Sequence, residues 1–406
     1  RVLTEVTHNL TIAGSTSITS LTGLAGLMKV GGNLRLISLP HVTTLAPLSA
    51  LSYGGLDVEV MDGLTSLSGL RPAPATMTGG IGVVNNRNLL SATIFRNVTS
   101  IDGALDIRGN PLFTDLNDLG LVTHVGGNVA IGGTGLTTIA RLASLQSIDG
   151  DLRLMVNDLD GLSTFELPAL TIVGGDLPTD VTRFGSTPTQ TSVLTIRFAA
   201  LTNIIGGVIG EGHNNRTVRP FDLILPALQT VGQTAGAVNI DGTPGLRNLT
   251  VAALNTAAVV NVDNDPDLEA VVIGSVSTAS TFNIDGNPSL KSIQVNGVFQ
   301  VDGTLNIDGN ASLVSIHFGG PIQIGETMNI DGNRSLLSIQ FSGGTVGGTA
   351  NIDNNALLSS LTGPLSSVGG TLNVDHNPKL SNQAAMAWAA AISAAGGKNI
   401  KDNGTP

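Results

Sequence analysis

The sequence predicts an all-β fold, namely a parallel β-solenoid of roughly 16 coils with a short C-terminal capping helix. Three observations predict it. One phrase recurs with a period of 22–23 residues, apolar and polar residues alternate within that phrase, and no coil carries a helical stripe of ten or more residues. Aromatic residues make up only 3% of the chain, so Leu, Ile and Val must fill a narrow core.

The recurring phrase is Asn-Ile-Asp-Gly or a close variant of it. Its copies are spaced by 22, 22, 23, 23, 22 and 22 residues and begin at Asn239, Asn261, Asn283, Asn306, Asn329, Asn351 and Asn373. Side chains of a strand alternate between its two faces. Leu305 and Ile307 should therefore lie in the core, with Asn306 and Asp308 facing outward. Turn residues such as Gly309 then lead to the next side of the coil.

The chain divides into four segments by the quality of the repeat. Residues 1–175 carry a looser, leucine-rich form, and residues 237–381 carry the regular phrase. Between them, residues 176–236 are expected to form irregular coils with a protruding loop around 206–217. Residues 382–406 are expected to form an Ala-rich helix up to residue 395, which covers the open edge of the last coil, and a tail.

The combined phrase resembles the receptor L-domain branch of leucine-rich-repeat-like proteins. The resemblance is carried by Leu-Met-Lys-Val-Gly-Gly-Asn-Leu-Arg-Leu from Leu27, Leu-Thr-Ile-Val-Gly-Gly-Asp-Leu from Leu170 and Val-Gly-Gly-Thr-Leu-Asn-Val-Asp-His-Asn-Pro from Val368. The stretch from Asn377 is similar to the closing cap of bacterial surface proteins of this type, although those often carry Cys where this chain has Asn382. The resemblance implies a β-solenoid that is secreted or displayed on a cell surface, and it transfers no binding residue.

Charge and composition exclude several classes of partner. The net charge is −11 and no basic patch is present, which argues against nucleic acid and anionic membranes. No apolar run approaches the roughly 20 residues that span a bilayer, so no membrane insertion is expected. The chain has no Cys and therefore neither disulfides nor thiolate sites. It begins at Arg1 and not at Met, the pattern left by signal-peptide cleavage, which favours a secreted or surface location.

The aspartates of the phrase are the most specific candidate site. They should stack in one outward row, Asp241, Asp263, Asp285, Asp308, Asp331, Asp353 and Asp375. Each is expected to cap its own turn by accepting backbone N–H groups. Two alternatives remain open. One is calcium bridging, with Asp285, Asp308 and Asp331 as the ligands. The other is a contact face for a partner chain or a glycan.

No catalytic residue or organic cofactor is predicted, and the chain is not expected to be an enzyme. General acid–base catalysis needs an isolated pair of carboxyl groups in distinct surroundings, whereas the ladder repeats one arrangement seven times. Of the Asn-x-Ser/Thr sequons, Asn215 in the loop and Asn310 and Asn333 in turns expected to be exposed are the best candidates for glycosylation.

The expected function is that of an extracellular structural or adhesive repeat protein, the subunit of a surface filament or sheath. Head-to-tail self-association is expected, with the tail from Lys398 adding a strand to the first coil of a neighbour. The alternative is a receptor-like module that binds a glycan or a surface protein, through a solenoid face or the loop at 210–220.

Overall fold

The computed structural model describes residues 3–114, 116–155, 159, 161–178, 191–210, 219–232, 237–254 and 259–404. It confirms the predicted class, a parallel β-solenoid of about 15 turns with one short helix near the C-terminus. The chain falls into two compact units, Arg1–Leu201 and Thr202–Pro406. The predicted loop at 206–217 and the sequon at Asn215 lie largely or wholly outside the described residues.

The first unit has two strand-bearing sides and one side of 3-10 turns. One sheet contains β1 (Glu5–Val6), β2 (Leu10–Ala13), β3 (Lys29–Ile37), β4 (Ser52–Glu59), β6 (Ile81–Val84), β8 (Leu105–Asn110), β10 (Val129–Thr134) and β12 (Leu152–Leu154). A second run contains β5 (Thr76–Met77), β7 (Ser100–Ile101), β9 (His124–Val125), β11 (Ser147–Ile148) and β14 (Ile172–Val173). The unit ends with β13 (Thr164–Glu166), β15 (Leu177–Pro178) and β16 (Leu194–Arg197).

The third side of this unit is built from the leucine-rich arcs. They form the 3-10 turns η1 (Thr22–Leu24), η2 (Ala46–Leu48), η3 (Thr93–Phe95), η4 (Asn117–Leu119) and η5 (Ala140–Ser144). In these arcs leucines recur at three-residue spacing, as in Leu45 and Leu48, both buried. A 3-10 turn brings residues i and i+3 to the same side, so the spacing suits a tight turn better than a strand.

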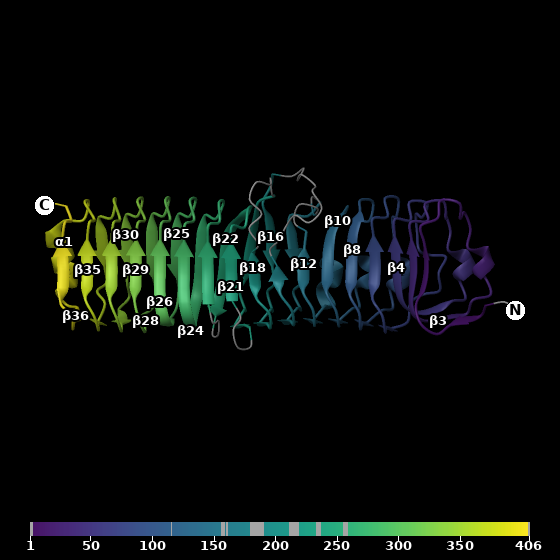
Figure 1. Ribbon diagram of the computed structural model, residues 1–406, viewed down its shortest axis with the longest axis horizontal. Coiled ribbons are helices and arrows are strands. Elements are labelled where there is room, and N and C mark those ends of the chain that lie inside the picture. The colour runs from purple at the N-terminus through teal and green to yellow at the C-terminus, as the bar shows by residue number, and fades with distance from the viewer. Residues whose placement is uncertain are drawn as a thin grey trace. The chain divides into compact units, whose positions relative to one another are not determined.

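The second unit carries strands on three sides, and its described strands pair in parallel. It begins with β17 (Asn203–Ile204), β18 (Val208–Gly210), β19 (Phe221–Leu225) and β20 (Thr230–Val231). The first side, called here the Asn/Asp face, contains β21 (Ala237–Asp241), β23 (Val259–Asp263), the ends of β24 (Ala270–Asp285) and β26 (Phe299–Asp308), β29 (Met328–Asp331), β32 (Ala350–Asp353), β35 (Leu372–Asp375) and β37 (Lys398–Lys401). Figure 1 shows these strands side by side along the unit.

The other two sides of the second unit follow the same order. One contains β22 (Leu246–Leu254), the start of β24, β25 (Ser292–Val295), β27 (Ser315–Phe318), β30 (Ser338–Gln340) and β33 (Ser360–Thr362). The other contains the start of β26, β28 (Ile322–Ile324), β31 (Gly344–Val346), β34 (Ser367–Val368) and β36 (Ser393–Ala394). The alternating Ser-Ile-Gln-Val of β25 has the burial pattern of a strand, so a third strand replaces the 3-10 arc.

The predicted strand faces are confirmed. Leu305 and Ile307 are 0% and 1% exposed, whereas Asn306 and Asp308 are partly exposed. Phenylalanines also stack through the core of this unit. The ring centroids of Phe299 and Phe318 are 5.6 Å apart, and those of Phe318 and Phe341 are 5.4 Å apart. The few aromatic residues of the chain are thus partly concentrated in the core of this unit, which the composition alone could not show.

The C-terminal helix is shorter than predicted and does not end the solenoid. α1 spans Asn382–Ala389, and the Ser381 hydroxyl caps it by accepting the N–H of Ala384. Trp388 of α1 lies 5.8 Å from the ring of Phe341, which extends the aromatic stack. The chain then continues into β36 and β37, which pair with β34 and β35. The helix thus replaces one side of the final coil, and β37 forms the last strand.

Candidate functional site

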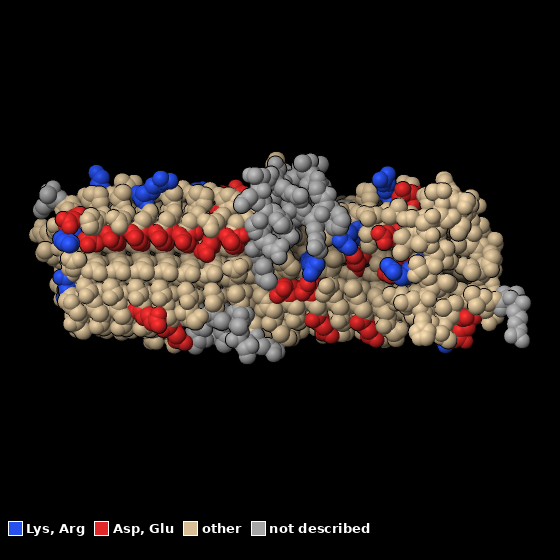
Figure 2. Space-filling view, in the orientation of Figure 1, with Lys and Arg blue, Asp and Glu red and all other residues tan. Residues whose placement is uncertain are grey.

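The Asn/Asp face carries two straight rows of polar side chains. Strand register pairs each aspartate of the phrase with its equivalent in the next coil, from Asp241 through to Asp375. Figure 2 shows them as a continuous red row. Lys401 of β37 stands in register with Asp375 and so places a positive charge at the end of the row.

The neighbouring row of asparagines is tied together by its own side chains. The Nδ2 of Asn306 donates to Oδ1 of Asn283, and that of Asn329 donates to Oδ1 of Asn306, both at 2.8 Å. The same bond continues to Asn351 and Asn373 at 2.7 Å. Each amide both donates and accepts, so this row is fixed in one orientation.

The carboxylates of the aspartate row are partly buried and repel one another. Burial, followed by the like charges of Asp285 and Asp241, raises the pKa of Asp263 to about 6. Burial and neighbouring carboxylates also raise the pKa of Asp308 and of Asp353. The buried Oδ1 atoms of Asp263 and Asp331 have no hydrogen-bond partner, and that of Asp353 faces Nδ1 of His376 at 3.3 Å. The row therefore favours bound protons or cations.

The outward aspartates were expected to cap their own turns, but the turn N–H groups mainly bond to other acceptors. The N–H of Gly309 donates to the main-chain carbonyl of Asp331 at 3.2 Å, and the N–H of Asn310 donates to Oδ1 of Asn333 at 3.0 Å. The turn N–H groups are thus already used by the next coil. Attraction between the Gly309 N–H and the Asp308 carboxylate is the smallest influence on the pKa of Asp308.

Capping instead comes from a buried asparagine ladder that the sequence analysis did not recognise. Its asparagine rungs are fully buried and lie two residues after each of the last five outward aspartates, at Asn287, Asn310, Asn333, Asn355 and Asn377. Each Oδ1 accepts the N–H of the preceding rung, and each Nδ2 donates to a strand carbonyl, as from Asn310 to Ile284 at 2.9 Å. The recurring Asn after Asp-Gly was the available signal. Asn86 and Asn110 form a similar pair in the first unit.

This ladder corrects the glycosylation prediction. Asn310 and Asn333 were expected in exposed turns, and that expectation is wrong, because both side chains are 0% exposed and hydrogen-bonded on both sides. A folded chain offers no access to either Nδ2. Asn215 lies outside the described residues.

The three predicted calcium ligands are brought together. Asp285, Asp308 and Asp331 are consecutive members of one row, in strand register. A second group lies nearer the C-terminus, where one ligand atom each of Asp353, Asp375 and His376 lie within 4.8 Å of one another. His376 adopts a left-handed turn (φ 51°), and its Nδ1 is 3.3 Å from the Asp353 carboxylate. The same arrangement forms an ion pair when the imidazole is protonated.

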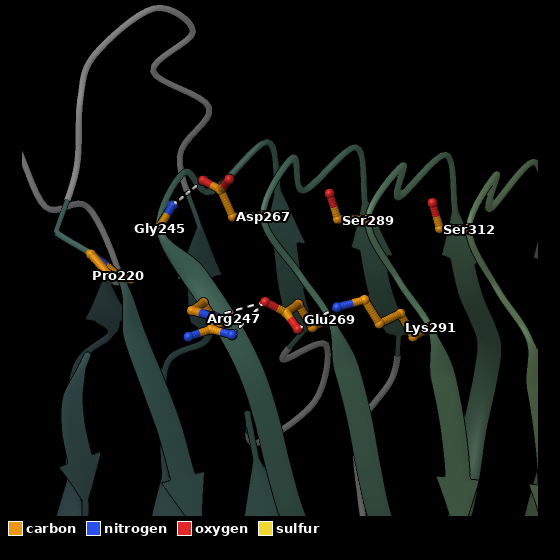
Figure 3. A pocket seen from close by; sticks show the side chains of 8 residues that line it. All are labelled: Pro220, Gly245, Arg247, Asp267, Glu269, Ser289, Lys291 and Ser312. Carbon is orange, nitrogen blue, oxygen red and sulfur yellow. Dashed lines mark hydrogen bonds and ion pairs between the residues drawn. The ribbon is translucent and has the colours of Figure 1, made fainter. Parts of the chain in front are cut away.

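Away from this face, a hollow of about 430 Å³ lies beside the turns of the second unit. Figure 3 shows Arg247 in β22 and, in the next two coils, Glu269 and Lys291, the residues immediately before β24 and β25; Glu269 lies between the two cations. The Nε of Arg247 is 2.9 Å from the Glu269 carboxylate, and the Nζ of Lys291 is 2.7 Å from it. Both cations lower the pKa of Glu269. Hydroxyl groups of Ser289 and Ser312 line the same hollow.

A second hollow, of about 510 Å³, lies on the first unit where glycines such as Gly80 and Gly82 leave room between charged side chains. Its walls include the Arg35–Asp57 ion pair at 3.0 Å and the Arg108–Asp106 ion pair. Burial raises the pKa of Asp57, against the opposing effect of Arg35. Both hollows carry charged side chains of both signs.

Comparisons with known proteins give a structural neighbour but no family. No protein-family model matches the chain, and no curated protein matches it. Among solved structures, a leucine-rich repeat protein from Bacteroides ovatus ATCC 8483 is 15% identical, with a TM-score of 0.33. The alignment covers 98% of this chain and 92% of that one. Within the described residues, no helix is long and apolar enough to cross a bilayer.

Proposed function

We propose that the chain is a non-enzymatic, extracellular structural or adhesive repeat protein, the subunit of a surface filament or sheath. One observation carries the proposal, namely that seven successive coils present the same Asn and Asp pair, in register, on one face. A repeated surface suits repeated contacts along an extended partner. Catalysis by carboxyl groups would need two of them in different surroundings.

Head-to-tail assembly is supported by the last strand, although not in the form that the sequence suggested. The tail was expected to bind a neighbour, whereas β37 pairs with β35 of its own chain. Its outer edge pairs with no strand among the described residues. Because the N–H of Leu372 binds the carbonyl of Gly397, the alternation of a parallel ladder directs the N–H of Ile400 outward. Such an edge is a template for another strand, and a heterologous contact there extends into a fibre.

Sedimentation and electron microscopy of the purified chain over a range of concentrations test this proposal. The wild type and Ile400→Val should form high-mass species. Ile400→Pro should not, because it removes an outward backbone donor while leaving the donors that face β35. Far-ultraviolet circular dichroism should be alike for all three. A wild type that stays monomeric at every concentration contradicts the filament role.

The second candidate is a glycan- or protein-binding module, and the hollow around Arg247 favours it. Charged side chains and hydroxyl groups converge there, as a polar ligand requires. Glycan-array binding by the wild type that is lost in Arg247→Gln, but kept in Arg334→Gln outside the hollow, would support this candidate. Accessibility of the protein to protease on intact cells tests the surface location for either candidate.

A further inference from the structure

One rung of the buried ladder is an aspartate. Asp265 is 0% exposed and stands where the next coils carry Asn287 and Asn310. Its N–H donates to Oδ1 of Asn287 at 2.9 Å, and its Oδ1 accepts the N–H of Thr243 at 2.6 Å. These are the two bonds that an asparagine rung makes at the same atoms, so Asp265 has taken the ladder geometry.

The other oxygen of Asp265 takes the place of an amide nitrogen. In the next rungs this nitrogen donates to a strand carbonyl, from Asn287 to Val262 at 2.7 Å and from Asn310 to Ile284 at 2.9 Å. It also lies 3.1 Å from Oδ1 of the following rung in the case of Asn287. Register aligns Ile240 with Val262 and Val262 with Ile284. Oδ2 of Asp265 is therefore directed toward the Ile240 carbonyl and Oδ1 of Asn287.

Both of these neighbours are acceptors, and Oδ2 has no hydrogen-bond partner. A carboxylate at this position would be buried, charged and faced by oxygen atoms on two sides, which is unfavourable. A proton on Oδ2 removes the charge and supplies the missing donor. We propose that Asp265 is a proton-carrying rung, neutral in the folded protein, whose deprotonation destabilises the coils on either side of it.

The charges around Asp265 act in the same direction. The charged groups on the neighbouring elements are Asp241 in β21, Asp263 in β23 and Asp285 in β24, together with Arg247 in β22 and Asp267 and Glu269 just before β24. Burial is the largest cause that raises the pKa of Asp265, and the negative charges of Asp241 and Asp263 add to it. The main-chain N–H and the side chain of Thr243 act in the opposite direction, and the net result is a pKa of about 7. Arg247 is engaged by Glu269 and is not among the groups that act on Asp265.

The sign of the effect follows from proton linkage. The folded state keeps the Asp265 proton up to about pH 7, whereas an unfolded chain releases it near pH 4. Between these values the folded state binds more protons, so stability falls as pH rises. Proton binding at Asp265 therefore makes the second unit more stable in mildly acidic than in alkaline solution.

Asp265→Asn isolates this group, because it restores the residue that the other rungs use. The unfolding equilibrium constant of wild type relative to Asp265→Asn should rise by roughly tenfold per pH unit between about pH 4 and 7, then level off. Urea unfolding of the full chain at closely spaced pH values measures it. Amide hydrogen exchange around β21 and β23 should show the same trend locally. Infrared spectra at pH 6 should contain a protonated carboxyl band that the variant lacks.

Asn287→Asp provides the converse test one coil further on. It should introduce a second decline of the same sign, absent from the wild type. The outer-row variant Asn283→Asp is the control, because its side chain is partly exposed and should give a much weaker trend. Parallel pH profiles of wild type and Asp265→Asn would overturn the proposal, as would an Asp265→Asn protein less stable than wild type at pH 8.

Discussion

Replacing the buried Asn333 with Ala tests whether the inward ladder holds the coils together. Oδ1 of Asn333 accepts the N–H of Asn310 at 3.0 Å, and its Nδ2 donates to the Ile307 carbonyl at 2.8 Å. Truncation leaves both main-chain groups buried without a partner. Each orphaned group costs roughly 1–3 kcal/mol, so the variant should lose about 2–6 kcal/mol of unfolding free energy.

The matched control is Asn329→Ala, four residues earlier in the same coil. Its side chain also bonds to two neighbours, Asn306 and Asn351, but these amides are partly exposed and water can replace it. Its loss should cost about 0.5–1.5 kcal/mol. Urea unfolding followed by circular dichroism gives both values from the shift in midpoint at constant slope. Equal losses in the two variants would refute the assignment of turn capping to the inward row.

Three further predictions concern the core, the row of charges and bound cations. Ile307→Asp should bury an unpaired charge beside Ile330, cost several kcal/mol and lower the thermal midpoint sharply, since both side chains are at most 1% exposed; an unchanged midpoint would mean that the strand faces are inverted. Because the pKa of Asp263 is raised to about 6, the contribution of this group to the free energy of unfolding is fully present below about pH 4 and is lost as pH rises through 6. The thermal midpoint should therefore be higher at pH 4.5 than at pH 8. Added salt should reduce the part of this difference that comes from repulsion between the carboxylates. If protons alone relieve the row, EDTA should leave the midpoint unaltered at pH 7.5, whereas a drop that Ca²⁺ reverses would identify Asp285, Asp308 and Asp331 as ligands.

The sequence predicts the solenoid well because the recurring phrase gives the length of each coil directly, 22–23 residues. Alternation in residues 304–308 places Leu305 and Ile307 in the core, and register follows from the constant spacing of the phrase. Whether the third side of a coil is a 3-10 turn or a strand is harder to predict. Leu45 and Leu48 in an arc and Ile293 and Val295 in a strand are all buried aliphatic residues. Only their spacing, three in the arc and two in the strand, separates a 3-10 turn from a strand.

The candidate site was predicted in part, since alternation gives the side of a strand but not that of a turn residue. Asp308 faces outward by the rule of alternation, and the structure confirms it. Asn310 follows a left-handed glycine (Gly309, φ 63°), where the rule no longer holds. The backbone reverses the expected side and carries the amide into the core. The course of the C-terminal tail was missed for a different reason, because Lys398–Lys401 lacks the phrase although it pairs like a member of the array.

The two polar rows of a coil show why the phrase uses Asp at one position and Asn two residues later. An outward carboxylate keeps contact with water, so a row of them is tolerable even with raised pKa values. An inward rung must accept one backbone hydrogen bond and donate another at a fully buried position, and of the two side chains only the amide does both at every pH. An aspartate does so only while it holds a proton. Asp265 is thus the inward rung at which the fold itself becomes sensitive to pH, and the outward row around it adds to the effect through Asp241 and Asp263.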